Sequence, residues 1–198
     1  MKTNGKNNTS MKVNLARWLS SLDRFCPLTY FLILGVVSCA PSVNNMKPIQ
    51  VGSSIPTFVL PDQNGNLFDI KSVLGKQNLV IYFYPKDDTP GCTKEACAFR
   101  DQFEVFREAD AAIIGISSDD VESHKKFAGK YNLTYTLLSD KEGVVRKLFG
   151  VPSDLFGLLP GRVTYVVNKQ GIVVHMFDSQ SQVEKHIEEA LAALKKIG

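Results

Sequence analysis

The fold of this chain is indicated most clearly by residues 79 to 97, which read LVIYFYPKDDTPGCTKEAC. Residues 79 to 84 form a continuous apolar and aromatic run, which predicts a strand buried on both faces of a sheet. Pro85 ends this run. Apolar side chains then recur at spacings of three and four residues, which predicts a helix from about Cys92 to Ala109.

The rest of the chain continues this alternation of strands and helices. A hairpin is predicted around Asn64-Gly65, from 57–60 to 67–70. Pairs of residues typical of capping boxes, Asp119 with Glu122 and Ser179 with Gln182, predict two helix starts. Further strands are expected at 112–116 and 135–138, a helix at 143–149, a loop at 152–161, and a hairpin of 163–167 and 172–177. The pattern predicts an α/β protein with a central mixed sheet flanked by helices, compatible with a thioredoxin-like fold carrying an N-terminal β-hairpin.

Length and charge limit the possible functions. The 198 residues, 44% of them hydrophobic and 22% charged, suit one globular domain. Residues 1–50 contain six basic side chains and one acidic one, and the remaining residues contain 17 basic and 19 acidic ones. A mildly acidic domain without basic clusters is a poor candidate for binding nucleic acid. The change in charge near residue 50 predicts a leader and linker at 1–50 and a thioredoxin-like domain at 51–198.

The leader contains an uncharged run, Leu28–Val37, followed closely by Cys39. Ten residues are too few to span a bilayer of about 30 Å, but they suit the apolar part of a secretory signal. The segment around Cys39 resembles a bacterial lipoprotein signal, which favours an exported protein anchored to the membrane through Cys39 on the periplasmic side. An organellar transit peptide is the main alternative, because the segment has almost no acidic residues. A disordered tail on a cytoplasmic protein and a true start at Met11 also remain open.

Cys92 lies where a thiol can act as a nucleophile. The predicted helix follows the C-terminal end of a buried strand, where α/β sheets place their ligand sites. Unpaired N–H groups and a partial positive charge at a helix N-terminus favour thiolate over thiol. A lone cysteine at such a position is otherwise a small buried hydrophobic residue.

Cys97 strengthens the functional interpretation. On an unbroken helix, residues five apart have Cα atoms roughly 8 to 9 Å apart, whereas a disulfide needs less than about 7 Å. Cys92 continues the stripe of Ala96 and Phe99, and Cys97 points away from it. The two cysteines therefore cannot join until the first turns unwind. This geometry suits a cycle in which Cys92 reacts first and Cys97 second.

The spacing of Pro85, Thr89 and Cys92, P-x-x-x-T-x-x-C, matches the active-site pattern of peroxiredoxins. Together with PGCTKEAC, the chain resembles the peroxiredoxin Q, or bacterioferritin-comigratory-protein, group. The resemblance extends from about Val51 to the C-terminus and includes residues 139–140, 149–151 and 160–165.

The resemblance implies a role for each matching residue. Cys92 would be the peroxidatic cysteine, whose thiolate attacks the terminal peroxide oxygen and becomes a sulfenic acid. The Thr89 hydroxyl would bind thiolate and peroxide, Pro85 would shield the pocket from water, and Arg162 would supply a positive charge. Cys97 would resolve the sulfenic acid to a disulfide, which thioredoxin or another dithiol donor reduces. The expected substrates are hydrogen peroxide and organic hydroperoxides, without metal or cofactor, acted on by a monomer or weak dimer.

Each residue also has a purely structural interpretation. Thr89 suits a helix N-cap, and Arg162 suits a solvated charge at a strand end. Glu95 either pairs with a nearby base or is an exposed acid in the first helical turn. The three histidines are interpreted as surface residues: His124, His175 and His186.

Three other functions compete with the peroxidase. A membrane-anchored, thioredoxin-like copper chaperone would also carry two nearby cysteines and a histidine, but in the spacing C-x3-C rather than C-x4-C. A thiol-disulfide oxidoreductase would carry C-x-x-C. A lipoprotein that keeps the fold without activity would not need Pro85, Thr89, Cys92 and Arg162 together.

Overall fold

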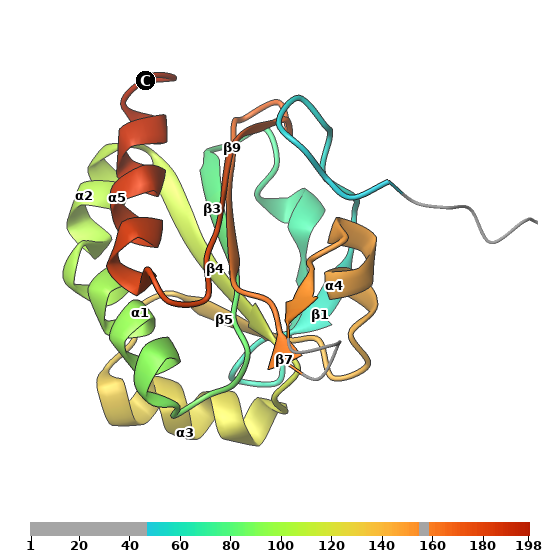
Figure 1. The fold of residues 1–198 in the computed structure, drawn as a ribbon, viewed down its shortest axis with the longest axis vertical. Coiled ribbons are helices and arrows are strands. Elements are labelled where there is room, and N and C mark those ends of the chain that lie inside the picture. The colour runs from blue at the N-terminus through green and yellow to red at the C-terminus, as the bar shows by residue number, and fades with distance from the viewer. Residues whose placement is uncertain (1–46, 155–158) are drawn as a thin grey trace, which may run out of the picture. The chain divides into compact units, whose positions relative to one another are not determined.

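A mixed five-stranded sheet forms the centre of the computed structural model, which describes residues 47–154 and 159–198 (Figure 1). The described residues all belong to one compact unit that begins at Asn45. The strand order is β5-β4-β3-β8-β9. Strands β3 and β4 are parallel, as are β4 and β5, whereas β8 is antiparallel to both β3 and β9. These strands are β3 (Asn78–Phe83), β4 (Ala111–Ser117), β5 (Thr136–Ser139), β8 (Val163–Val167) and β9 (Val173–Asp178).

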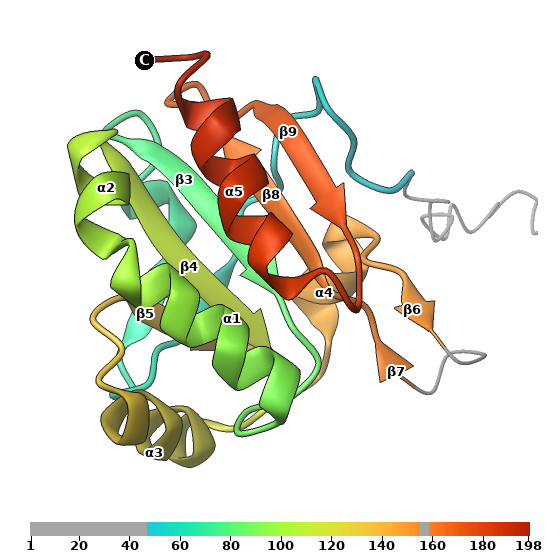
Figure 2. The ribbon, with the colours of Figure 1, turned by 60° about the vertical axis from the view of Figure 1, so that its left-hand side comes forward.

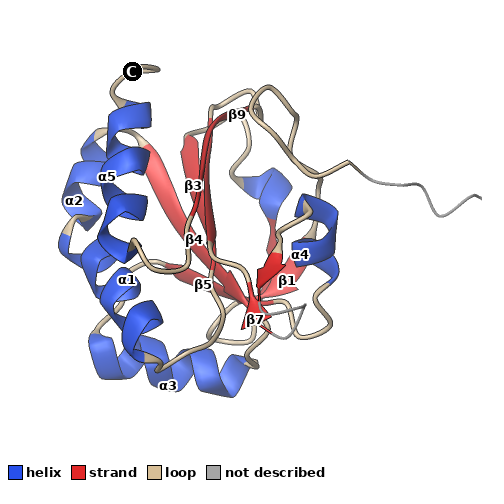
Figure 3. Cartoon of the chain, in the orientation of Figure 1, coloured by secondary structure: helices blue, strands red, loops and turns tan. Residues whose placement is uncertain are grey.

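The remaining elements cover the two faces of this sheet (Figure 3). One face carries α1 (Pro90–Asp101), α2 (Phe103–Glu108), α3 (Val121–Tyr131) and α5 (Val183–Leu194). The other carries the hairpin of β1 (Val59–Pro61) and β2 (Leu67–Asp69), the 3-10 turn η1 (Ile70–Ser72), and α4 (Val144–Phe149). The thioredoxin-like architecture with an N-terminal hairpin, predicted from the order of strands and helices, is confirmed.

Strand β3 connects the two hydrophobic cores, and all six of its residues are buried. Successive side chains of a strand point to opposite faces, so the apolar run is divided between the cores. Val80 and Tyr82 pack in the core of α1 and α5. Leu79, Ile81 and Phe83 pack in the core of the hairpin and α4.

Several predicted boundaries differ from the structure. The helix expected from Cys92 to Ala109 is interrupted at Gln102, whose φ of −99° and ψ of 7° leave the helical region. The apolar spacing continues through this bend, so periodicity did not reveal it. The loop expected at 152–161 contains a small hairpin of β6 (Ser153–Asp154) and β7 (Leu159–Pro160).

Of the two predicted capping boxes, the one at Asp119 is wrong. Asp120, not Asp119, caps α3 by accepting a hydrogen bond from Ser123 N at 2.9 Å. The Asp119 carboxylate instead accepts a hydrogen bond from Asp87 N at 2.9 Å, which ties it to the loop after β3. Ser179 Oγ does accept a hydrogen bond from Gln182 N at 3.2 Å, as the second predicted box requires, but α5 begins only after Gln182.

The predictions for the leader, including Leu28–Val37 and Cys39, concern residues outside the described part of the chain. In the described part, no helix has the length and apolar character required to cross a membrane.

Candidate active site

Cys92 lies in the first turn of α1, directly after the loop that leaves β3. Thr89 occupies the N-cap position, and Pro90 begins the helix, where its missing N–H is harmless. Cys92 therefore lies in the first turn of a helix, where backbone N–H groups have no partner within the helix. The residue is almost completely buried, and both Cys92 and Cys97 are free thiols.

Arg162 contacts Cys92 from the start of the neighbouring strand β8. It directly precedes β8, and Val163 pairs with Phe83 at the end of β3, so two segments distant in sequence meet at one sheet edge. The Arg162 side chain is buried, and its Nη2 donates a hydrogen bond to Cys92 Sγ at 3.3 Å. Arg162 is therefore a buried residue of the site and not a solvated charge at a strand end.

Gly91 makes this approach of the guanidinium possible. A Cβ atom at Gly91 would lie only 3.3 Å from Arg162 Nη2. Any larger side chain would press against the group that contacts Cys92. Gly91 was not among the residues predicted for the site, although it directly precedes the cysteine.

Glu95 is buried completely on the next turn of α1. Its Oε2 accepts a hydrogen bond from Arg162 Nη1, so one guanidinium contacts both the thiol and the carboxyl group. Glu95 Oε1 has no hydrogen-bond partner. Burial raises the pKa of Glu95 to about 8, and Arg162 opposes this shift only in part. Of the two interpretations of Glu95, the buried pair with a base is correct.

His186 of α5 lies behind Glu95, with 3.8 Å between His186 Nδ1 and Glu95 Oε1. Helices α1 and α5 lie side by side over the sheet (Figure 2). His186 Nε2 donates to Ser179 O at 2.8 Å, and burial lowers the pKa of His186 to about 4. The ring is therefore neutral near pH 7, and its Nδ1 accepts a hydrogen bond from Thr164 Oγ1 at 2.8 Å.

The expectation that all histidines lie on the surface is wrong. His186 and His124 are completely buried, and only His175 is partly exposed. His124 Nδ1 lies 2.9 Å from Asp87 Oδ2, beneath the loop that carries Pro85 and Thr89. Asp87 also accepts hydrogen bonds from the hydroxyl groups of Tyr84 and Ser123. These buried hydrogen bonds of Asp87 hold the loop between β3 and α1 in place.

Exposed side chains also hold the loop between β3 and α1, through hydrogen bonds to Asp88. Asp88 adopts a φ of 57°, which is uncommon for residues other than glycine. Its carboxylate accepts hydrogen bonds from Lys130 Nζ and Tyr131 Oη, each at 2.7 Å. Pro85 and Thr89 are half-buried in this loop, and Thr89 Oγ1 donates to Lys86 O rather than capping the helix.

Arg146 of α4 carries a second guanidinium near the Cys92 thiol. Arg146 was not predicted from the sequence. It donates hydrogen bonds to Tyr84 O and Gly161 O, each at 2.9 Å. These carbonyls precede the Pro85 loop and Arg162, so Arg146 joins both segments of the site. Burial lowers the pKa of Arg146, and the charges of nearby groups, including Cys92, oppose that shift.

Cys97 lies on the same unbroken helix as Cys92 but is less buried. Two buried hydroxyl groups support this part of α1: Tyr135 donates to Ala96 O at 3.0 Å and lies 2.9 Å from the hydroxyl of Tyr82. The structure thus brings Arg162 into contact with Cys92, with Pro85 and Thr89 in the loop that leads to α1 and Cys97 farther along the helix.

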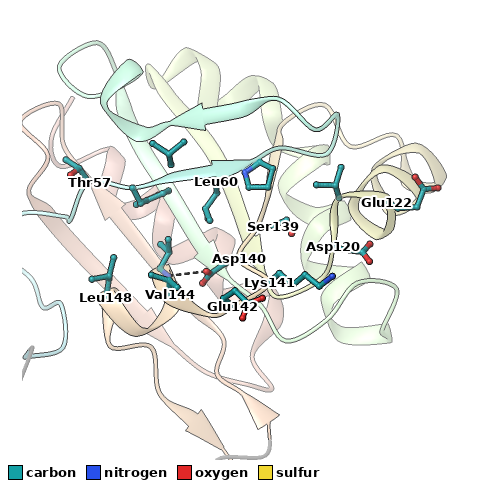
Figure 4. A pocket seen from close by; sticks show the side chains of 15 residues that line it. Thr57, Leu60, Asp120, Glu122, Ser139, Asp140, Lys141, Glu142, Val144 and Leu148 are labelled. Carbon is teal, nitrogen blue, oxygen red and sulfur yellow. Dashed lines mark hydrogen bonds between the residues drawn. The ribbon is translucent and has the colours of Figure 1, made fainter. Parts of the chain in front are cut away.

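A pocket of about 720 Å³ lies between β1 and α4, on the hairpin face of the sheet (Figure 4). The carboxylate of Asp140 caps α4 here by accepting a hydrogen bond from Val145 N at 3.1 Å. Neither Cys92 nor Cys97 lines this pocket. It is therefore not the place where the thiol meets a ligand.

Known proteins match this chain over most of its length. A profile described as the AhpC/TSA family matches residues 51–176. "Peroxiredoxin Q, chloroplastic" of Arabidopsis thaliana is 56% identical over 147 residues, which cover 74% of this chain and 68% of the relative. The relative of that name from Gentiana triflora is 50% identical over 183 residues, or 89% of this chain and 83% of its own. The crystal structure of peroxidoxin BcpB from Mycobacterium tuberculosis gives a TM-score of 0.71 at 39% identity, covering 76% of this chain and 99% of that one.

These relatives also decide between earlier alternatives. They do not favour a copper chaperone or a thiol-disulfide oxidoreductase. The expectation of an exported, membrane-anchored lipoprotein is wrong, because relatives at 52 to 56% identity are named as chloroplastic proteins. A basic leader with a short apolar run suits both a secretory signal and a transit peptide, and a cysteine after that run does not distinguish them.

Proposed function

Because the chain belongs to the AhpC/TSA family and is a thiol-dependent peroxidase, we propose that Cys92 is its peroxidatic cysteine. The contact between Arg162 Nη2 and Cys92 Sγ carries this proposal, since it combines a guanidinium with the N-terminus of α1 at one sulfur atom. Both favour a thiolate. Among the described residues no guanidinium donates a hydrogen bond to Cys97, although the charge of Arg100 interacts with it.

The peroxide step follows from this arrangement. The Cys92 thiolate attacks the terminal oxygen of the peroxide, so that an S–O bond forms and the O–O bond breaks. Arg162 stabilises the negative charge that develops on the leaving oxygen. The half-buried positions of Thr89 and Pro85 support their roles in binding the peroxide and limiting water at the sulfur.

We propose that Cys97 then resolves the sulfenic acid of Cys92. The Cys97 thiol displaces the hydroxyl group, which leaves as water with the formation of a disulfide. Because α1 runs unbroken from Pro90 to Asp101, its first turns must unwind before the sulfur atoms can meet. Thioredoxin or a similar dithiol then reduces the disulfide and is itself oxidised.

Two variants test this assignment. Cys92→Ser should abolish the consumption of hydrogen peroxide with a dithiol donor, and full activity would refute the assignment. Cys97→Ser serves as the matched control, because it should consume one equivalent of peroxide and then stop with a sulfenic acid at Cys92. Continued turnover of Cys97→Ser at the wild-type rate would exclude the intramolecular disulfide.

We also propose that residues 51–198 are the catalytic domain and that residues 1–50 contain an organellar address. The basic, acid-poor composition of residues 1–50 and the chloroplastic relatives support this address. Imaging the full chain with a fluorescent protein at its C-terminus would test it, and a signal spread through the cytosol would contradict it. The monomer or weak dimer stays a prediction for light scattering.

A further inference from the structure

His124 of α3 belongs to a buried hydrogen-bond network that the peroxide step described above does not use. Its side chain is completely buried, and both of its ring nitrogens face oxygen atoms. Nδ1 lies 2.9 Å from Asp87 Oδ2, and Nε2 lies 3.2 Å from the carbonyl oxygen of Leu138. Leu138 belongs to β5, the strand at one edge of the central sheet. His124 thereby joins the loop between β3 and α1 to that edge strand.

The partners of the His124 ring indicate that both nitrogens carry a proton. A carbonyl oxygen only accepts hydrogen bonds, so Nε2 donates to Leu138 O. Nδ1 faces the Asp87 carboxylate, which also accepts hydrogen bonds from the hydroxyl groups of Tyr84 and Ser123, at 2.7 and 2.8 Å. Hydrogen bonds donated to a carboxylate favour its charged form, so Nδ1 is the third donor. A ring with two N–H groups carries a positive charge.

The groups around the ring agree with a buried ion pair of His124 and Asp87. A neutral ring beside the carboxylate would turn one nitrogen lone pair toward an oxygen atom, which is costly in a buried site. The other titratable group facing the ring is Tyr84, directly after β3, whose Oη lies 3.4 Å from Nδ1. Burial raises the pKa of Tyr84 well above its ordinary value, so its hydroxyl remains a donor. Asp119, from the loop before α3, accepts a hydrogen bond from Asp87 N.

We propose that the charged His124 is a positioning residue for the peroxide step. The proposal rests on the role of Cys92 proposed above. Asp87 lies two residues before Thr89, the N-cap of α1, so the position of Asp87 determines where the helix begins. The first turn of that helix carries Cys92, which meets Arg162 at 3.3 Å. A loop released from His124 would move this turn and weaken that contact.

The ion pair is built from elements that do not take part in the unwinding of α1. His124 belongs to α3, and its other partner, Leu138, belongs to β5. The outer contacts of the loop, at Asp88, are exposed and therefore weak. Charge-assisted hydrogen bonds in a buried site are stronger. His124 thus gives the loop a fixed position from which α1 forms again after each disulfide is reduced.

Nitrogen NMR of the reduced full chain, with isotope-labelled histidine, tests the charge. Both ring nitrogens of His124, assigned through their correlations to the backbone, should have the chemical shifts of N–H groups near pH 7. In Asp87→Asn, which keeps the shape of the side chain but removes its charge, one ring nitrogen should lose its proton. An unprotonated ring nitrogen in the wild-type protein would overturn the proposal, and this result depends on the folding of no variant.

Stopped-flow consumption of one equivalent of hydrogen peroxide tests the positioning, in proteins that also carry Cys97→Ser so that each molecule reacts once. His124→Gln should slow this step at least about 10-fold, because a shift of about 1 Å in a reacting group can cost about 100-fold. Asp87→Asn should slow it similarly and serves as the second variant where His124→Gln does not fold. His175→Gln is the matched control. It removes a partly exposed histidine that pairs with Glu189, and it should react at the wild-type rate.

The pH dependence separates a role of the charge from a role of packing. The ratio of the wild-type rate to the His124→Gln rate should stay constant while the His124 ring holds both protons. It should fall toward one at the pH where NMR shows the loss of a ring proton. The ionisation of Cys92 largely cancels in this ratio, because both proteins carry the same thiol.

Two kinetic results would also overturn the proposal. Equal rates in the wild type and in the folded variants would show that the peroxide step does not need the ion pair. A ratio that stays high after the ring has lost its proton would assign the effect to packing alone. Labelling of the Cys92 sulfenic acid, located by mass spectrometry in the same samples, separates the two levels of argument. If no sulfenic acid forms in the wild type, the proposed function fails; if it forms at equal rates in the variants, only the role of His124 fails.

Discussion

Glu95 should make the stability of the reduced enzyme depend on pH in a direction opposite to that of a normal carboxylate. The pKa of Glu95 is about 8 in the folded protein, against 4.5 without burial. Between these values the folded state holds a proton that the unfolded state has lost. The stabilisation is therefore complete below pH 4.5 and is lost as the pH rises through about 8.

The size of this effect follows from the shift. Each pH unit in this range should cost between about 1 and 2 kcal/mol, and the whole range about 5 kcal/mol at most. His186 acts in the opposite sense, because its lowered pKa of about 4 reduces stability as the pH falls. The comparison of interest is therefore wild type with Glu95→Gln at each pH, in which other groups largely cancel.

Urea unfolding of the reduced proteins measures this difference. Far-UV circular dichroism is the suitable probe, because the single tryptophan, Trp18, lies outside the described residues. The free energy of unfolding of wild type relative to Glu95→Gln should fall steadily from about pH 5 to about pH 8. A constant difference over this range would refute the burial of a protonated Glu95.

Three substitutions test neighbouring contacts. Arg162→Ala should slow the peroxide step by about 100-fold, measured by stopped-flow consumption of hydrogen peroxide. Arg162→Lys should recover only part of the rate, because lysine lacks the planar fork of N–H donors of arginine. A wild-type rate in Arg162→Ala would remove this residue from the mechanism. Gly91→Ala should displace the Arg162 guanidinium from Cys92 and slow the peroxide step, while the free energy of unfolding in urea changes little. An unchanged rate would show that the peroxide step does not depend on the exact position of this guanidinium. Tyr135→Phe removes the hydroxyl group that donates to Ala96 O and should destabilise the reduced enzyme by about 1 kcal/mol. Formation of the Cys92–Cys97 disulfide should become faster, because α1 unwinds more easily. Slower disulfide formation would contradict a role of Tyr135 in holding α1 folded.

The central sheet could be predicted because its strands are strongly patterned. The run 79–84 is buried on both faces, and the alternation with helices left few topologies. Boundaries were harder, because Asp119 and Asp120 are chemically equivalent caps and only the packed loop selects Asp120.

The surroundings of Cys92 were predicted less completely. Nothing in a linear pattern shows that Arg162 Nη2 reaches a sulfur 70 residues earlier; the resemblance to peroxiredoxins supplied that expectation. The burial of His186 had a signal that was overlooked. It lies on the apolar stripe of Val183, Ile187 and Ala190, and His124 likewise lies on one face with Phe127 and Ala128. A polar residue on such a stripe indicates a buried hydrogen-bond network.

The apolar side chains form two separate cores, one on each face of the central sheet, and only one of them contains residues of α1. Cys92, Ala96 and Phe99 all belong to the core shared with α5, and no residue of α1 belongs to the core beneath the hairpin and α4. Unwinding the first turns of α1 therefore opens one core at its margin and leaves the other intact. If α1 unwinds in each cycle as proposed, the packing beneath the hairpin and α4 preserves one face of the sheet on which that helix refolds.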